Sequence, residues 1–182
     1  MKKLLFLGAF IITLALIYTS CAKKSSTISI KGCMDKSACN YYSIATVDDG
    51  SCIFQPSGTV TTFLQNDNGD NKCLDFKTGS TTTSCTNFSY WTGDLYFSSY
   101  TNFSVCTHLV KGIIDIGVVS CVGGVTTKPV SGYTTTVASI LGHGYVVVLQ
   151  DSTYARIYCD AWELDTNNGI IGVKIEWQYP FN

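Results

Sequence analysis

Residues 171–179 read Ile171-Gly172-Val173-Lys174-Ile175-Glu176-Trp177-Gln178-Tyr179, an alternation of large apolar side chains with polar or small ones. Successive side chains of a β-strand point to opposite faces, so this stretch predicts a half-buried antiparallel strand. Residues 154–162 alternate in the same way. Here Ala155, Ile157, Cys159 and Ala161 alternate with Tyr154, Arg156, Tyr158, Asp160 and Trp162. The Asn168-Gly169 step between the two stretches predicts a hairpin.

The same pattern extends toward the amino terminus from this hairpin. Residues 145–150 form a continuous apolar run that ends at Asp151-Ser152-Thr153, which predicts a third strand of a meander. Earlier candidate strands are Val60–Gln65, Cys73–Lys77, Trp91–Phe97, Phe103–Val110, Ile113–Val119 and Tyr133–Ala138. No segment has the 3.6-residue apolar stripe of an amphipathic helix. The sequence therefore predicts an all-β domain over residues 57–182, either an antiparallel β-sandwich or an open barrel.

The amino terminus has the layout of an export signal. Lys2 and Lys3 precede an apolar run over residues 4–18, and Thr19-Ser20-Cys21 follows it. This run is shorter than the roughly 20 residues that a transmembrane helix needs. Small residues before a cysteine resemble the lipobox of bacterial lipoproteins, although Tyr18 stands where that family usually has an aliphatic residue.

That resemblance implies a signal peptide over residues 1–20, with Cys21 as the acylated first residue of the mature chain. Residues 21–31 then form a lipidated, polar tether. The expected location is the outer membrane, held there by lipid, on its periplasmic face or at the cell surface. An ordinary signal peptide that releases a secreted soluble protein is the alternative.

The charge balance argues against a nucleic-acid partner. The chain has 12 Lys and Arg against 13 Asp and Glu. Loss of Lys2 and Lys3 with the signal leaves 10 against 13, a net charge of −3. Nucleic-acid binding requires a basic patch, for which this composition provides no basis.

The chain contains nine cysteines, an odd number that requires an explanation in an exported protein. Lipidation of Cys21 would leave an even eight. An oxidising compartment favours disulfides, so the sequence predicts four bridges. The predicted disulfide cysteines are Cys33, Cys39, Cys52, Cys73, Cys85, Cys106, Cys121 and Cys159.

Residues 32–54 form a separate small cysteine module. They are too few to bury a core, so a staple is required, and Cys33 and Cys52 bracket the segment. Cys39 has no partner within the module and is expected to bond to a later cysteine. The pattern from Gly32-Cys33 to Asp48-Asp49-Gly50-Ser51-Cys52 resembles a short cysteine module of secreted Bacteroidetes proteins.

Two interpretations apply to the polar side chains of this module. Calcium prefers hard oxygen ligands, and the candidates are Asp35, Asn40, Asp48 and Asp49. Capping of turns through local backbone hydrogen bonds is the alternative, and the sequence favours it. No other cofactor is predicted.

The β domain is also similar in motif order to the HmuY-type family of Bacteroidetes lipoproteins. The motifs are Trp91-x-Gly93-Asp94-Leu95-Tyr96-Phe97, Gly142-His143-x-Tyr145 and Tyr154-Ala155-Arg156-Ile157. Here Gly93 separates the Trp from the Asp, and Arg156 replaces the usual Lys. The resemblance implies haem carriage, for which His108 and His143 are the candidate ligands. Turn capping by His143 and a half-exposed strand position for His108 are the alternatives.

No motif predicts an enzyme. A Cys106–His108 pair is the nearest approach to a nucleophile and base, but Cys106 is expected in a disulfide. The function expected is a non-catalytic, membrane-anchored binding, adhesion or structural module of the bacterial envelope. Its expected partners are the membrane, through the lipid, and an extracellular protein or glycan. The alternatives are a carrier of haem or another small ligand, and a calcium-stabilised recognition module.

Overall fold

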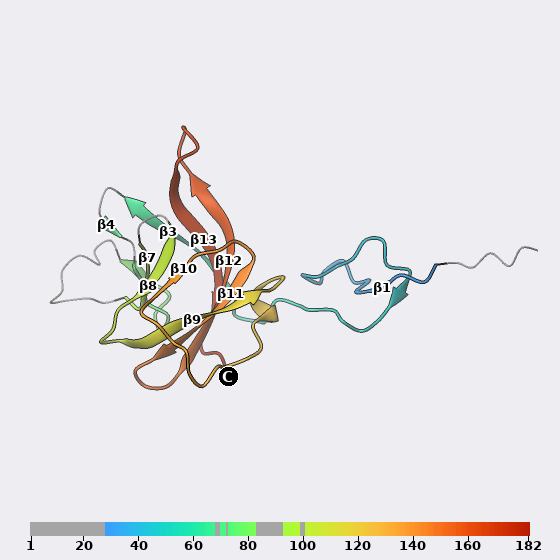
Figure 1. Ribbon diagram of the computed structural model, residues 1–182, viewed down its shortest axis with the longest axis horizontal. Coiled ribbons are helices and arrows are strands. Elements are labelled where there is room, and N and C mark those ends of the chain that lie inside the picture. Colours follow the sequence, from blue (N-terminus) through green and yellow to red (C-terminus); the bar gives the residue numbers. More distant parts are fainter. Residues whose placement is uncertain (1–27, 68–69, 72, 83–92, 99–100) are drawn as a thin grey trace, which may run out of the picture. The chain divides into compact units, whose positions relative to one another are not determined.

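The computed structural model describes residues 28–67, 70–71, 73–82, 93–98 and 101–182. Residues Lys31–Asn182 form one compact unit, whose described part contains β-strands and a single 3₁₀ turn, η1 (Val122–Gly124), and no α-helix (Figure 1). The two large sheets are antiparallel and do not close into a barrel. The predicted all-β, antiparallel and open architecture is therefore confirmed.

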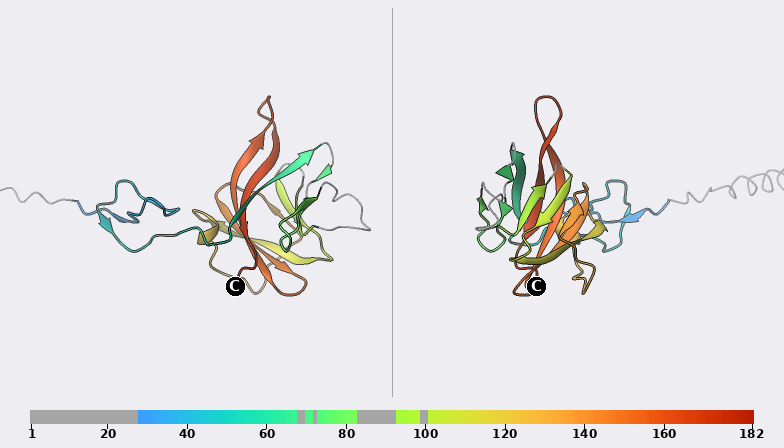
Figure 2. Two further views of the ribbon diagram at one scale, coloured as in Figure 1. Left: turned by 180° about the vertical axis from the view of Figure 1, so that it is seen from behind. Right: turned by 60° about the vertical axis from the view of Figure 1, so that its left-hand side comes forward.

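The larger sheet has six strands in the order β4-β3-β13-β12-β11-β9. Its strands are β3 (Val60–Asp67), β4 (Asp70–Asn71), β9 (Val110–Val118), β11 (His143–Leu149), β12 (Tyr154–Leu164) and β13 (Ile170–Gln178). The β12–β13 hairpin extends past its neighbouring strands (Figure 2). The predicted meander of the last three strands thus forms the centre of this sheet.

The smaller sheet has five strands in the order β10-β8-β7-β5-β6. Its strands are β5 (Cys73–Leu74), β6 (Thr81–Thr82), β7 (Leu95–Ser98), β8 (Asn102–Val105) and β10 (Thr136–Ala138). An isolated antiparallel bridge between Ile113 and Thr134 joins the β9 edge of one sheet to the approach to β10 in the other. The two sheets are therefore linked along one side.

Inward side chains from both sheets form one main core. Phe97 and Phe103 of the smaller sheet and Tyr145, Ile157 and Ile175 of the larger one are all fully buried. The Phe103 and Tyr145 rings meet edge to face, with centroids 5.1 Å apart. The Tyr145 hydroxyl donates to the Ala138 carbonyl at 2.9 Å, so this buried polar group is satisfied.

The predicted alternation holds in β13 and in the first half of β12. Cys159 is fully buried, but the pairing register shifts between Cys159 and Ala161. A bulge adds a residue to one strand and reverses which side chains point inward. Trp162 therefore packs against the core, with its ring centroid 6.1 Å from that of Phe97.

The predicted hairpin turn is present, but Asp165 caps it and Asn168 takes its left-handed position, neither of which the Asn-Gly step predicts. Asp165 caps the turn, because its Oδ1 accepts hydrogen bonds from the backbone N–H groups of Asn167 and Gly169. Asn168, rather than Gly169, has the left-handed backbone, with φ of 62°. Asparagine tolerates this region better than most residues, which explains its place here.

A second, smaller hydrophobic cluster lies on the other face of the six-stranded sheet. It consists of Val125, Val146 and Phe181, with partly buried neighbours such as Tyr133 and Tyr154 packed around them. This cluster explains why β11 reads as a continuous apolar run, since both of its faces are covered. Phe181 also donates its backbone N–H to the Tyr154 carbonyl at 2.7 Å, which fixes the chain end.

Candidate functional site

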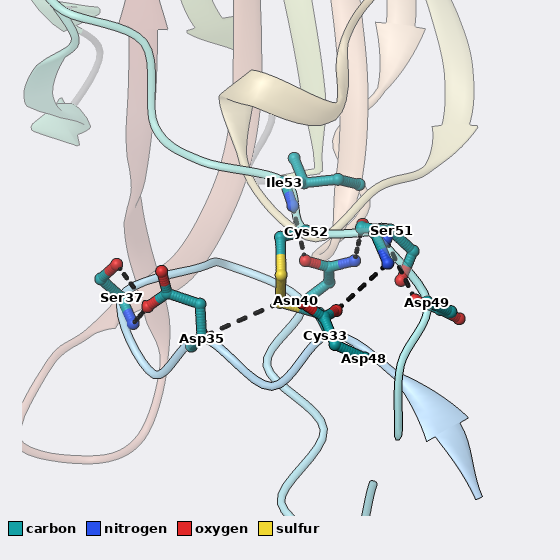
Figure 3. The surroundings of a disulfide bond; sticks show 10 residues. Cys33, Asp35, Ser37, Asn40, Asp48, Asp49, Ser51, Cys52 and Ile53 are labelled. Atoms are coloured by element: carbon teal, nitrogen blue, oxygen red, sulfur yellow. Dashed lines mark hydrogen bonds between the residues drawn. A yellow bond between two sulfur atoms is a disulfide. The ribbon is translucent and has the colours of Figure 1, made fainter. Parts of the chain in front are cut away.

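The cysteine module is closed by a disulfide between Cys33 and Cys52, as predicted (Figure 3). Its only strands are the short parallel pair β1 (Lys31–Gly32) and β2 (Val47–Asp48). Asn40 holds the second half of the loop from inside, because its amide donates to the Ser51 carbonyl at 2.6 Å and accepts from the Ile53 N–H at 2.7 Å. The disulfide and this asparagine take the place of a hydrophobic core.

The calcium candidates cap turns within this module. Asp35 accepts from the N–H and hydroxyl of Ser37, Asp48 from the Gly50 N–H, and Asp49 from the Ser51 N–H. The hydrogen bonds from Ser37 hold the pKa of Asp35 below its usual value, and those from Ser51 do the same for Asp49. The described residues contain no group of three or more His, Cys, Asp or Glu side chains placed to hold a metal ion. These contacts match the capping interpretation.

The other cysteines follow the prediction only in part. Cys39 bonds to Cys121, as expected for a bridge between the module and the β domain, and Cys73 is also disulfide-bonded. Cys106 and Cys159 are not in disulfides, so the prediction that every cysteine after Cys21 is bonded was wrong for these two. Cys85 and Cys21 lie outside the described residues.

Their surroundings explain why these two thiols stay apart. Cys159 points into the main core between the sheets, and burial raises its pKa to about 12, so it behaves as a small apolar side chain. Cys106 follows the last residue of β8 and lines a surface cavity instead. Burial also raises the pKa of the Cys106 thiol, which favours its protonated form.

The two candidate haem ligands are not brought together. His108 lies in the turn before β9, whereas His143 is paired in register with Val118 at the far end of β9. A strand advances about 3.3 Å per residue, so the eight steps from Val110 to Val118 separate these ends by roughly 26 Å. The Nδ1 atom of His143 also lies 3.0 Å from both carboxylate oxygens of Asp115. A site that uses both histidines as ligands is therefore not formed.

His108 borders a surface cavity of about 300 Å³ on the outer side of the five-stranded sheet. Its lining residues are Tyr96, Val105, Cys106, Thr107, His108, Thr135 and Thr136. Strand pairing explains this grouping, because Tyr96 is in register with Ser104, and Ser104 with Thr136. Side chains opposite each other in antiparallel strands lie on the same face.

Hydroxyl groups connect these strands beneath the cavity. The Ser104 hydroxyl lies 2.9 Å from that of Ser98 and 3.0 Å from that of Thr136, and Ser104 is 5 % exposed. A buried hydroxyl normally requires hydrogen-bond partners, and this three-strand ladder provides them. The ladder fixes the side chain of Thr136, which lines the cavity.

The turn that presents His108 is held from two directions. The Cys106 carbonyl accepts hydrogen bonds from the N–H groups of Leu109 and Val110, which closes the turn. Gln150 braces it from the β11–β12 hairpin, because its side-chain amide donates to the Thr107 carbonyl at 2.9 Å. The Sγ atom of Cys106 lies 3.1 Å from Nδ1 and 3.6 Å from Nε2 of His108. The imidazole and the thiol therefore face each other at the cavity wall.

Sequence reasoning found part of this site. The Cys106–His108 spacing was noticed, but the segment 103–110 was predicted as one strand, whereas β8 ends at Val105 and a turn follows. Thr135 and Thr136 were missed. Their grouping depends on the pairing order β10-β8-β7, for which the sequence carries no local signal.

Residues 1–27, which carry the predicted export signal and Cys21, lie outside the described residues. Within the described part of the chain, no helix is both long and apolar enough to cross a membrane.

Two solved structures resemble this fold. One, described as a HmuY-like haem-binding protein from Bacteroides vulgatus, is 13% identical, with a TM-score of 0.49 over 71% of this chain and 97% of that chain. The other, described as a lipoprotein from Bacteroides fragilis, is 8% identical, with a TM-score of 0.51 over 71% of this chain and 94% of that chain. At 8% identity, the similarity to the Bacteroides fragilis protein shows that the two chains share a fold. No family model and no curated protein matches the chain.

Proposed function

We propose that this chain is a non-catalytic, lipid-anchored protein of the bacterial envelope whose β-sandwich binds a small polar ligand in the cavity beside His108. The observation that carries the binding role is the cavity itself. It lies on paired strands, a hydroxyl ladder fixes its lining residue Thr136, and an imidazole and a thiol line its wall. A concave site with a few converging polar groups on a rigid scaffold is typical of small-ligand recognition.

The anchoring role rests on residues 1–21. A basic start, a short apolar run and a cysteine after small residues fit export and lipidation at Cys21. The proposed location is the outer membrane, on its periplasmic face or at the surface. The fold shared with a Bacteroides fragilis lipoprotein is compatible with that location.

The anchor is tested by replacing Cys21 with Ser in a Bacteroides host fed an alkyne-labelled fatty acid. The wild-type chain should take up the label and fractionate with membranes, whereas Cys21→Ser should lose the label and leave the membrane fraction. Uptake of label by the variant would contradict acylation at this position.

Two features support binding without catalysis. The raised pKa of Cys106 favours a thiol over the thiolate that acts as a nucleophile. The His143–Asp115 pair lies at the other end of β9, too far away to act as a base for Cys106. Sustained turnover in a broad hydrolase screen that is lost in Cys106→Ser would overturn this part of the proposal.

The binding role is tested by filling the cavity. Thr136→Trp places a large side chain over the base, and Thr61→Trp makes the same change at an exposed position of β3 on the other sheet. Compounds that raise the melting temperature of the wild type and of Thr61→Trp should fail with Thr136→Trp. Hits that are unaffected by Thr136→Trp would place binding elsewhere.

Haem carriage is the second candidate, favoured by the exposed imidazole at the cavity wall. Histidine is a common axial ligand of haem iron. Under this alternative, His108→Ala should abolish the Soret shift on haem titration. His143→Ala is the matched control and should leave the shift unchanged, because His143 lies at the opposite end of β9.

A further inference from the structure

Three exposed apolar side chains gather at one corner of the six-stranded sheet, where β9 ends and β11 begins. Val118, the last residue of β9, is 82% exposed, and Ile140 and Leu141, in the turn before β11, are each 41% exposed. The Val119 N–H donates to the Gly142 carbonyl at 2.9 Å, so the two segments lie side by side. We call Val118, Ile140 and Leu141 the apolar corner.

The turn that carries Ile140 and Leu141 is held in place by its backbone. The His143 N–H donates to the Ile140 carbonyl at 3.2 Å, and Gly142 takes a φ of 78°, which suits glycine at the third position of a turn. The Ile140 N–H donates at 2.7 Å to the hydroxyl of the buried Tyr145. Because these contacts use backbone groups of the turn, they fix its position and leave its apolar side chains at the surface.

The segments that meet at the apolar corner carry no Asp, Glu, Lys or Arg over residues 116–127 and 129–142. Asp115, which precedes the first segment, is turned onto the Gly117 N–H at 2.7 Å and onto Nδ1 of His143 at 3.0 Å. Turns normally favour polar residues, so apolar side chains at a turn are unusual. Exposed apolar surface of this kind marks contact with another protein or with a membrane.

The other end of the same two strands has the opposite character. There β11 leads into Asp151-Ser152-Thr153, where Lys77 lies 2.6 Å from Asp151 and Lys111 donates to the Ser152 hydroxyl at 2.7 Å. The β9–β11 pair therefore has one apolar end and one charged end. Burying a charge in a bilayer is costly, so only the apolar end suits contact with lipid.

The covalent route from the proposed lipid anchor enters the β domain beside this corner. Lys31 follows Cys21 by ten residues, and a fully extended chain covers at most about 3.6 Å per residue, so the start of the cysteine module lies within about 36 Å of the lipid. The module is bonded through Cys39 to Cys121, three residues after Val118. A surface tethered near a membrane contacts it intramolecularly, so a small patch is enough.

We propose that the apolar corner docks on the lipid bilayer to which Cys21 is anchored, with its side chains at the boundary between headgroups and acyl chains. The inference rests on the proposed anchor and adds an orientation of the β domain, with the turn at Asp151 directed away from the membrane. The cavity beside His108 lies at the other end of β9, so docking leaves it accessible to a ligand.

The test uses the acylated protein, purified in detergent from the host membrane and reconstituted in vesicles of phosphatidylethanolamine and phosphatidylglycerol. Bromine on the acyl chains, near the headgroups, quenches a tryptophan that it contacts. Leu141→Trp should lose emission in these vesicles, and its emission should shift to shorter wavelength. Phe63→Trp is the matched control, because Phe63 is also exposed and three strands of the sheet separate β3 from β9. Its emission should change no more than that of the wild type.

A charge at the apolar corner distinguishes docking by the native surface from insertion of the introduced indole. Val118→Asp should remove the extra quenching from Leu141→Trp, and Ile140→Asp gives the same readout if Val118→Asp does not fold. Quenching that persists in both would overturn the proposal.

The anchor and the docking surface can fail separately. Equal quenching of Leu141→Trp and Phe63→Trp, in protein that floats with the vesicles, would overturn docking and leave the anchor standing. If the purified wild type carries no acyl chain and does not float with the vesicles, the anchor itself is wrong and the docking surface falls with it.

Discussion

Asp94 is a buried carboxylate whose charge destabilises the folded chain. It is 5 % exposed, and one of its oxygens accepts a hydrogen bond from the Phe76 N–H at 2.9 Å. Burial raises its pKa to about 6, and the hydrogen bond from Phe76 offsets only part of this effect. The folded state therefore holds the Asp94 proton more tightly than the unfolded state does. Between about pH 4 and pH 6, the contribution of Asp94 to stability falls as the pH rises.

Asp94→Asn should consequently stabilise the protein at pH 7, because the amide oxygen can still accept from Phe76 while carrying no charge. A shift of this size corresponds to about 3 kcal/mol, and solvent screening reduces our expectation to about 1–2 kcal/mol. Urea unfolding at several pH values measures this difference, which should shrink toward pH 4. Parallel pH profiles for wild type and variant would show that Asp94 is not the group responsible.

Asp151 should contribute to the pH dependence of stability in the opposite direction from Asp94, which Asp151→Asn tests. Asp151 is an exposed carboxylate 2.6 Å from the Lys77 ammonium, and its hydrogen bond with that group lowers its pKa. Its contribution to stability should be present at neutral pH and lost in acid. Removing it should therefore flatten the acid end of the profile instead of raising stability at pH 7.

At the scale of elements, the pairing of β5 with β7 depends on Gly93. A Cβ atom at this position would lie 2.3 Å from the Cβ of Cys73, whose disulfide restricts its movement. The glycine directly before Asp94 is thus required by close strand approach. Gly93→Ala should destabilise the chain by about 1–3 kcal/mol, the usual cost of overpacking. Thermal unfolding measures this loss, with Thr61→Ala at an exposed position of β3 as the control. Equal melting temperatures for Gly93→Ala and Thr61→Ala would contradict the prediction.

The strands were predictable where period-two alternation is uninterrupted, as in β13, and where a strong turn follows, as at Asp151-Ser152-Thr153. They were not predictable where a distant contact decides the outcome. The bulge before Ala161 turns Trp162 toward Phe97, which comes from the other sheet. The end of β8 at Val105 likewise depends on bracing by Gln150, so His108 was placed on a strand that is in fact a turn.

For the molecule as a whole, the number of cysteines still bears on lipidation of Cys21, even though two of the predicted disulfide cysteines are free thiols. Removing Cys106 and Cys159 from the nine leaves seven, still an odd number. The Cys33–Cys52 and Cys39–Cys121 bridges account for four of these, and Cys73 is disulfide-bonded as well. Only Cys21 and Cys85 remain. If Cys21 carries the lipid, we expect non-reducing peptide mapping to join Cys73 to Cys85, and a Cys21-containing disulfide would exclude the anchor.

The Cys39–Cys121 and Cys33–Cys52 bridges should differ in their effect on stability. Cys39–Cys121 spans 82 residues, whereas Cys33–Cys52 spans 19. In the chain-entropy model, closing a longer loop restricts the unfolded state more, which gives a stabilisation of about 4–5 kcal/mol for the first bridge and about 3 kcal/mol for the second.

The double variant Cys39→Ser/Cys121→Ser should therefore unfold at a lower urea concentration than Cys33→Ser/Cys52→Ser, with tryptophan fluorescence as the readout. Tryptophan reports on the β domain, where Trp177 is buried in the core, and only the longer bridge ends in that domain. Loss of the shorter bridge should open the module and leave the tryptophan transition nearly unchanged. A clear shift of that transition in Cys33→Ser/Cys52→Ser would mean that the module and the sandwich unfold as a single unit, and the reverse order of the two variants would contradict the chain-entropy expectation.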